Sequence, residues 1–212
     1  MITTEHVQQS IEKALKGESN LTQEELSVRG FSTFTIRSLF NSLCNIEGTY
    51  LEVGLFCGAT FVSSFNKNLI SIGIENHAQD FSEGFEKVKK ELADNLEKFS
   101  HRSKEVKVFY EDCFAIDKDK LPNNIDVFFF DGFHSFETQR DALPYFLDNM
   151  SNKFAFLVDD FSWGYVKDGT DAGLALLSDK IEIEKCWVLR GYNLENDPIW
   201  HNSVAIYLIN KK

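Results

Sequence analysis

The sequence predicts an α/β domain in which helices cover both faces of a mostly parallel sheet. From residue 49 onward, short apolar segments of strand length alternate with segments of helix length, and such alternation is typical of parallel sheets. The strand segments are continuous apolar runs, as expected for strands that are buried on both faces. A length of 212 residues suits a single domain with a full hydrophobic core.

The helices and strands can be placed in order along the chain. The first 48 residues are expected to be helical, because apolar side chains recur there at helical spacing and Thr22–Glu25 has the form of a capping box. Two strands near the C-terminus are expected to pair antiparallel and to complete a seven-stranded sheet. The predicted strands are residues 50–53, 70–74, 106–110, 125–130, 154–158, 181–189 and 204–209, and the longest predicted helices are 81–99 and 136–147.

This pattern divides the chain into an N-terminal helical extension, residues 1–48, and a sheet domain, residues 49–212. The extension is expected to form a lid over the substrate or the contact of a homodimer. Simple cover for the core is a third role that the sequence leaves open.

The composition argues against two classes of partner. The net charge is −11, and the basic group Lys87, Lys89 and Lys90 alternates with Glu as on a solvated helix, so nucleic acid is not an expected partner. No apolar run approaches the ~20 residues that cross a membrane, and the N-terminus lacks the basic start and apolar core of a signal peptide. A cytoplasmic protein is therefore expected. Its cysteines are too far apart for a CxxC motif and are expected to be reduced: Cys44, Cys57, Cys113 and Cys186.

A glycine turn follows the first predicted strand. Glu52, Gly54 and Gly58 stand in the pattern Glu-x-Gly-x-x-x-Gly, and Thr60 follows in the next helix. Glycine at the first of these positions permits a tight turn and lets the backbone approach a ligand. A purely structural connection between strand and helix explains the same pattern, so the turn alone does not establish a ligand site.

Polar residues end the next two strands. Glu75 and Asn76 follow the second strand about 20 positions after the glycine turn, where a carboxylate can accept hydrogen bonds from both ribose hydroxyls of a nucleoside. The alternative is a solvated Glu at a strand end. The third strand runs into Asp112, Cys113 and Phe114. Together with the glycine turn, these residues predict a nucleoside pocket.

The fourth and fifth strands carry the most specific motifs. The segment Ile125–Glu137 ends in Phe-Asp-Gly-Phe-His-Ser-Phe-Glu and closely resembles the IDGDHSYE signature of the methyltransferase 24 family. The segment Asp159–Trp163 resembles the DDY or DDW strand end of the same family. The resemblance covers residues 49–163. Two positions depart from it: Phe133 replaces an acid at the pocket mouth, and residues 151–153 replace a Gly-Gly turn.

The resemblance implies the Rossmann-like fold of the class I methyltransferases and an activity similar to that of the macrocin-type O-methyltransferases. It places S-adenosylmethionine over the glycine turn. Asp112 would then bind the adenine amino group, Phe114 would pack against the adenine ring, and Cys113 would form part of the pocket wall. The implied cofactor pocket consists of Glu52, Gly54, Gly58, Thr60, Glu75, Asn76, Asp112, Cys113, Phe114 and Asp131.

Three carboxylates are expected at the ends of the fourth and fifth strands. Asp131, Asp159 and Asp160 would repel one another unless a cation joins them, and their oxygen atoms suit Mg²⁺ or a similar divalent ion. Such an ion would bind the acceptor hydroxyl and lower its pKa. In the alternative, these acids cap turns or bind backbone groups. His134, with Asp131 beside it, is the candidate catalytic base, although a solvent-bonded residue at a helix start explains it equally.

The sequence as a whole predicts a methyltransferase that transfers the methyl group of S-adenosylmethionine to the hydroxyl of a small molecule by direct displacement. Two other functions stay open, because a fold alone does not establish one: an oxidoreductase similar to the cephalosporin hydroxylases and a non-catalytic nucleoside-binding domain. Phe133, Phe161 and Trp163 would sandwich a planar acceptor in an enzyme and block the site in a binding domain. Sugar, phenol, polyketide and amino-acid hydroxyls all fit as acceptors.

Overall fold

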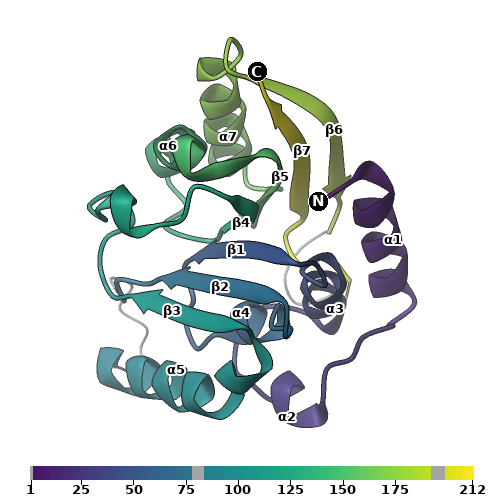
Figure 1. The fold of residues 1–212 in the computed structure, drawn as a ribbon, viewed down its shortest axis with the longest axis vertical. Helices are drawn as coiled ribbons and strands as arrows, with labels where there is room; N and C mark the ends of the chain where they lie inside the picture. The colour runs from purple at the N-terminus through teal and green to yellow at the C-terminus, as the bar shows by residue number, and fades with distance from the viewer. Residues whose placement is uncertain (1, 78–83, 192–198) are drawn as a thin grey trace.

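A computed structural model of the protein describes residues 2–77, 84–191 and 199–212. The described residues form one sheet of seven strands in the order β3-β2-β1-β4-β5-β7-β6 (Figure 1). Strands β1 to β5 run parallel, and β7 enters between β5 and β6, antiparallel to both. The strands are β1 (Gly48–Val53), β2 (Leu69–Ile74), β3 (Glu105–Phe109), β4 (Ile125–Phe130), β5 (Met150–Val158), β6 (Ile181–Leu189) and β7 (Val204–Lys211).

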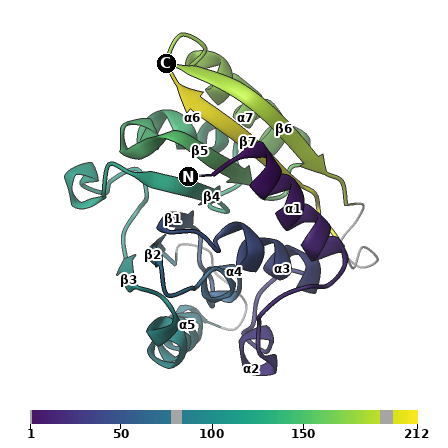
Figure 2. The same ribbon diagram turned by 45° about the vertical axis from the view of Figure 1, so that its right-hand side comes forward.

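The α-helices of the described residues are α1 (Thr4–Leu15), α2 (Gln23–Leu26), α3 (Phe34–Leu43), α4 (Ala59–Ser63), α5 (Phe85–Phe99), α6 (Phe136–Phe146) and α7 (Gly164–Leu176). They cover both faces of the sheet (Figure 1, Figure 2). Residues of α1, α3, α4 and α5 share one hydrophobic core with alternate residues of the strands, and α6 and α7 share a second core on the opposite face. None of the described helices is long and apolar enough to cross a membrane.

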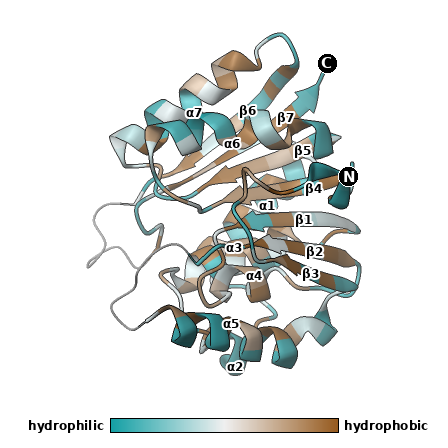
Figure 3. Cartoon of the chain, turned by 90° about the vertical axis from the view of Figure 1, so that its left-hand side faces the viewer, coloured by the Kyte–Doolittle hydropathy of each residue, from teal (hydrophilic) through white to brown (hydrophobic). Residues whose placement is uncertain are grey.

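The predicted Rossmann-like α/β fold is confirmed, including the antiparallel strand at the C-terminus. Strands β4 and β5 are mostly hydrophobic along their length (Figure 3), as expected for strands covered on both faces. Strand β5 begins at Met150 and not at Phe154, because the polar residues 151–153 extend it. Residues 81–83 of the helix predicted at 81–99 lie outside the described residues, and α5 occupies the rest from Phe85.

The N-terminal extension packs directly on the sheet. The ring of Phe40 on α3 lies 4.6 Å from that of Phe129 on β4, measured between centroids. On α1, the side chain of Gln8 accepts a hydrogen bond of 3.0 Å from the indole of Trp187 on β6. The apolar stripes of these helices are therefore buried in the same core as the strands. The division at residue 49 into an extension and a domain stays a prediction.

Helices α6 and α7 pack with their backbones in close contact. A Cβ atom at Gly169 would lie 2.5 Å from the carbonyl oxygen of Phe136, and one at Gly173 would lie 2.4 Å from that of Arg140. Any larger side chain at these two positions would push the helices apart.

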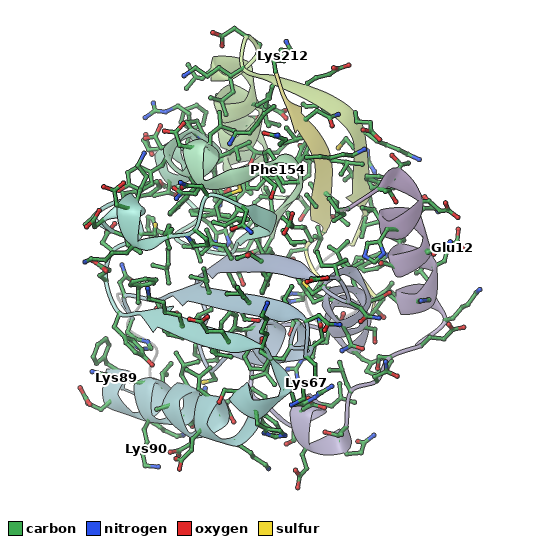
Figure 4. The ribbon with its side chains drawn as sticks, in the orientation of Figure 1. Glu12, Lys67, Lys89, Lys90, Phe154 and Lys212 are labelled. Carbon is green, nitrogen blue, oxygen red and sulfur yellow. The ribbon has the colours of Figure 1, made fainter. Side chains whose placement is uncertain are left out.

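Burial separates apolar from charged side chains: Phe154 is fully buried, whereas Lys67 and Lys89 are exposed (Figure 4).

Candidate functional site

A cavity of about 890 Å³ opens at the edge of the sheet where the parallel strands end. Ligands of open α/β sheets bind at this edge. The size lies near the upper end of the range for small-molecule sites. The cavity is lined by the segments that follow β1, β2, β3, β4 and β5, and by residues from the N- and C-terminal parts of the chain.

The glycine turn after β1 forms the floor of the cavity. Gly54 has a φ of 90°, and a Cβ atom there would lie 1.9 Å from the carbonyl oxygen of Asp131. The backbone of this turn therefore passes against β4 at a distance that only glycine allows. Gly54 and Thr60 line the cavity, whereas Gly58 begins α4 behind the turn and does not.

Glu52 does not line the cavity, although the sequence analysis assigned it to the cofactor pocket. Its side chain is fully buried and accepts hydrogen bonds of 2.5 Å from the hydroxyls of Tyr50 and Thr60. Burial raises the pKa of this carboxyl to about 8, against the opposing effect of the two hydrogen bonds. Glu52 thus supports the turn from inside by holding Thr60, which does face the cavity.

Glu75 at the end of β2 ties the second strand to the glycine turn. Its Oε2 accepts hydrogen bonds of 2.8 Å from the backbone N–H groups of Leu55 and Phe56. Its Oε1 accepts one of 2.6 Å from the backbone N–H of His77. The carboxylate lines the cavity, so it can organise the turn and contact a ligand at the same time.

His77 also lines the cavity, although it belongs to none of the sequence motifs described above. Its ring stacks on Tyr110 at 5.8 Å and meets the edge of Phe85 at 5.2 Å, between centroids. The Nδ1 atom lies 3.7 Å from Oε1 of Glu75, and within the described part of the chain neither buried ring nitrogen has a hydrogen-bond partner.

The residues predicted to surround a nucleoside base are brought to the same half of the cavity. Asn76, Asp112, Cys113 and Phe114 all line it. One oxygen of Asp112 accepts a hydrogen bond of 2.7 Å from the backbone of Phe114, which leaves its other oxygen available to a ligand. Burial raises the pKa of the Cys113 thiol to about 12, so this side chain is a neutral wall.

Asp131, Asp159 and Asp160 lie together around His134 in the other half of the cavity. The Nε2 atom of His134 is 3.4 Å from Oδ1 of Asp131 and 3.8 Å from Oδ2 of Asp160. Burial, and after it the charge of Asp160, raises the pKa of Asp131. Burial and the charge of Asp131 raise the pKa of Asp159 in the same way.

The three carboxylates do not form a metal site as they are placed. No group of three or more His, Cys, Asp or Glu side chains in the described part of the chain is arranged to hold a metal ion. Oδ1 of Asp160 instead accepts a hydrogen bond of 2.8 Å from Asn202, while its Oδ2 faces His134. The side chains therefore do not fit the predicted Mg²⁺ site in this arrangement, and its existence stays a prediction.

Aromatic side chains surround the half of the cavity that holds His134. Trp163 meets the His134 ring edge to face at 5.4 Å between centroids. Phe133 and Tyr165 line the cavity with 66% and 49% of their surface exposed, so they stand at its rim and do not fill it. Phe161 belongs to the hydrophobic core and does not line the cavity.

Two remote parts of the chain complete the wall, and the sequence analysis identified neither. Gly30, Phe31 and Ser32 reach the cavity from the connection between α2 and α3. His201 and Asn202 reach it from the turn before β7. Neither segment carries a motif, and only the pairing of distant segments in the fold brings them to the site.

Comparisons with known proteins support the fold. No protein-family model matches the chain, and no curated protein matches its sequence, so the resemblance to the methyltransferase 24 family and the macrocin-type enzymes stays a prediction. An O-methyltransferase of Bacillus cereus in complex with SAH, S-adenosylhomocysteine, aligns over 99% of this chain and 93% of its own, with a TM-score of 0.60 and 10% identity. An SAH-bound methyltransferase of Podospora anserina aligns over 100% of this chain and 89% of its own, with a TM-score of 0.56 and 13% identity.

A third similar structure is that of TrmN from Thermus thermophilus, with a TM-score of 0.59 and 13% identity over 89% of this chain. This chain spans only about half of that protein, 52% of its length. At such identities the likeness concerns the fold and not the reaction. The chain therefore has the Rossmann-like methyltransferase fold, with its cavity at the edge where such sheets bind ligands.

Proposed function

We propose that the protein transfers the methyl group of S-adenosylmethionine to a hydroxyl of a small molecule. The observation that carries this proposal is that one cavity joins two chemically different halves. One half holds the glycine turn, Glu75 and Asp112, and the other holds His134 and the three carboxylates. A methyltransferase needs such a pair of adjoining sites, because donor and acceptor must meet in line.

The first half fits the cofactor. The turn at Gly54 brings backbone close to a ligand, Glu75 offers a hydrogen-bond acceptor, and Asp112 keeps one carboxylate oxygen available. The cofactor would supply a methyl group on a positively charged sulfur, which leaves as a neutral thioether. Six acids and no Lys or Arg of the described residues line the cavity, so its electrostatic field favours this cationic donor.

His134 is the residue that we propose to remove the acceptor proton. His134 lines the cavity, and its buried Nε2 atom lies between Asp131 and Asp160 without a hydrogen-bond partner among the described residues. When the acceptor oxygen forms its bond to the methyl carbon, the hydroxyl proton passes to this nitrogen. The two carboxylates would then stabilise the imidazolium that forms, as a carboxylate does in other His-based proton transfers.

The lining of the second half indicates which acceptors fit. Phe133, Trp163 and Tyr165 offer flat apolar surfaces to a planar molecule. No Lys or Arg of the described residues lines the cavity to bind a phosphate or carboxylate, and residues 78–83 and 192–198, which are not described, contain no Lys or Arg in their sequence. We therefore propose a neutral or cationic aromatic acceptor. Nucleic acid is a poor candidate for the same reason.

Two further proposals concern the whole protein. Because Phe31, Ser32 and Ile36 line the cavity, we favour a lid over a dimer contact as the role of residues 1–48. We also propose a cytoplasmic location, where the four cysteines of the sequence would stay reduced.

The test is a screen of pooled hydroxylated metabolites for formation of S-adenosylhomocysteine. We expect turnover with an aromatic acceptor, and we expect His134→Ala to lower kcat by about 10²–10⁴-fold with little change in cofactor affinity. His101→Ala is the matched control, since His101 is exposed and its ring bonds the backbone carbonyl of Lys98, away from the cavity. Oxygen consumption without S-adenosylhomocysteine would favour the oxidoreductase. Tight cofactor binding without any turnover would favour a binding domain.

A further inference from the structure

We infer that His77 binds one of the two ribose hydroxyls of the cofactor, while Glu75 binds the other. This inference rests on the proposed function and refines it, because it assigns a ligand contact to a residue outside the recognised motifs. The two residues lie side by side at the end of β2, with 3.7 Å between Nδ1 of His77 and Oε1 of Glu75.

Glu75 already accepts three hydrogen bonds from the backbone. An ionised carboxylate has about four lone-pair sites. The backbone N–H groups of Leu55 and Phe56 occupy both sites of Oε2, and that of His77 occupies one site of Oε1. One site therefore remains, on Oε1. The expectation that this carboxylate accepts both ribose hydroxyls cannot hold while the glycine turn keeps its hydrogen bonds.

The ring of His77 lies beside that site. The side chain of His77 is only 4% exposed, and both of its ring nitrogens are buried without a hydrogen-bond partner among the described residues. Leaving buried polar atoms unpaired is costly, and native proteins rarely tolerate it without a reason. Because His77 lines the cavity, a ligand hydroxyl can supply the missing hydrogen bond.

The imidazole of His77 matches a ribose hydroxyl chemically. Burial lowers the pKa of His77, against the opposing charge of Glu75, so the ring is held neutral. A neutral imidazole has one N–H donor and one acceptor nitrogen, and either can pair with a hydroxyl. Tyr110 stacks on the ring and Phe85 meets it edge to face, which fixes its orientation. The two neighbouring ribose hydroxyls would thus meet Glu75, which can only accept a hydrogen bond, and His77, which can accept or donate one.

The test measures the affinity for S-adenosylhomocysteine and for its 2′-deoxy and 3′-deoxy analogues by calorimetry. In the natural protein, removal of the hydroxyl that His77 binds should weaken binding about three- to tenfold, as for one neutral hydrogen bond. In His77→Phe, which keeps an aromatic ring without nitrogens, the same removal should change the affinity by less than about twofold. A merely structural role of His77 would weaken all three ligands equally.

A second variant at the same position tests whether the effect of His77→Phe comes from misfolding. The φ of His77 is 50°, a value that Phe56 also adopts in this protein, and His77→Gly removes the ring at a position where glycine is unstrained. His77→Gly should show the same loss of discrimination between the ligands, and His101→Phe should show none. An unchanged ratio of affinities in the His77 variants, or no loss with either analogue in the natural protein, would overturn this inference alone. Failure of the natural protein to bind S-adenosylhomocysteine would overturn the proposed function as well.

Discussion

The carboxylate of Glu75 holds the backbone N–H of Leu55 at 2.8 Å, across the gap between the end of β2 and the turn after β1. One side chain thus fixes the shape of the turn and offers its remaining oxygen to the cavity. Loss of the carboxylate removes two functions at once: it leaves backbone donors without an acceptor, and it removes a ligand contact.

Glu75→Ala should therefore weaken binding of S-adenosylhomocysteine by about 1–3 kcal/mol and lower the melting temperature as well. Glu75→Gln is the matched control, because its single amide oxygen can still accept hydrogen bonds from the turn, so its effect should be smaller in both measurements. Calorimetry and thermal unfolding check the two effects. An unchanged affinity in Glu75→Ala would remove this residue from the site.

The backbone at Gly54 lies so close to the carbonyl of Asp131 that no larger residue fits, and Gly84 serves as a control for this contact. Gly54 and Gly84 have φ values of 90° and 85°, but a Cβ atom at Gly84 has no neighbour within 4 Å among the residues that the structure describes. Gly84→Ala should cost only the backbone strain, about 1–3 kcal/mol. Gly54→Ala should cost more in urea unfolding and should also weaken cofactor binding, because the new Cβ overlaps the carbonyl of Asp131. Equal costs for the two variants would contradict the contact.

Glu52 should make the stability of the protein depend on pH. Its pKa is raised from 4.5 to about 8 in the folded protein, chiefly by burial. Between these values the unfolded chain loses this proton while the folded protein keeps it, so stability falls as the pH rises from about 4.5 to about 8. Below that window the group adds no penalty. Glu52→Gln should remove this part of the pH dependence, which urea unfolding at about pH 5 and about pH 8.5 can measure.

Removal of metal ions separates the two ways of activating the acceptor. If His134 takes the proton, turnover should continue at its full rate in excess EDTA. Loss of turnover that Mg²⁺ restores, with unchanged affinity for the cofactor, would transfer the activation to a cation held by Asp131, Asp159 and Asp160. Asp160→Asn should then be milder than Asp159→Ala, since an amide oxygen still coordinates a hard cation.

Much of the fold could be predicted because buried parallel strands leave a strong signal in the sequence. Continuous apolar runs such as Val127–Phe130 and Phe154–Val158 are typical of strands covered on both faces, and the polar residues that follow them lie at one edge of the sheet. This reasoning brought Asp131 and Asp160 to one place without knowledge of the contacts.

The direction of individual side chains was harder to predict. Glu52 shares a face of β1 with Tyr50, beneath α4, whereas Leu51 and Val53 point to the other core. In sequence, a Glu near a strand end resembles a ligand-binding acid. Its burial becomes clear only when the alternation of side chains along the strand shows which face of the sheet it points to. His77 gave no signal for a different reason. The role that we propose for it depends on ring nitrogens that have no hydrogen-bond partner among the described residues, and such an absence cannot be read from a sequence.

The glycine contacts between α6 and α7 have a consequence for how this protein could change its acceptor. Helix α6 begins just after His134 and α7 just after Trp163, so the spacing of the two helices sets the distance between the proposed base and the aromatic wall. A larger residue at Gly173 would separate the helices well away from any ligand. Selection for new acceptors could therefore act on the interface of these helices and leave every residue that touches the ligand unchanged.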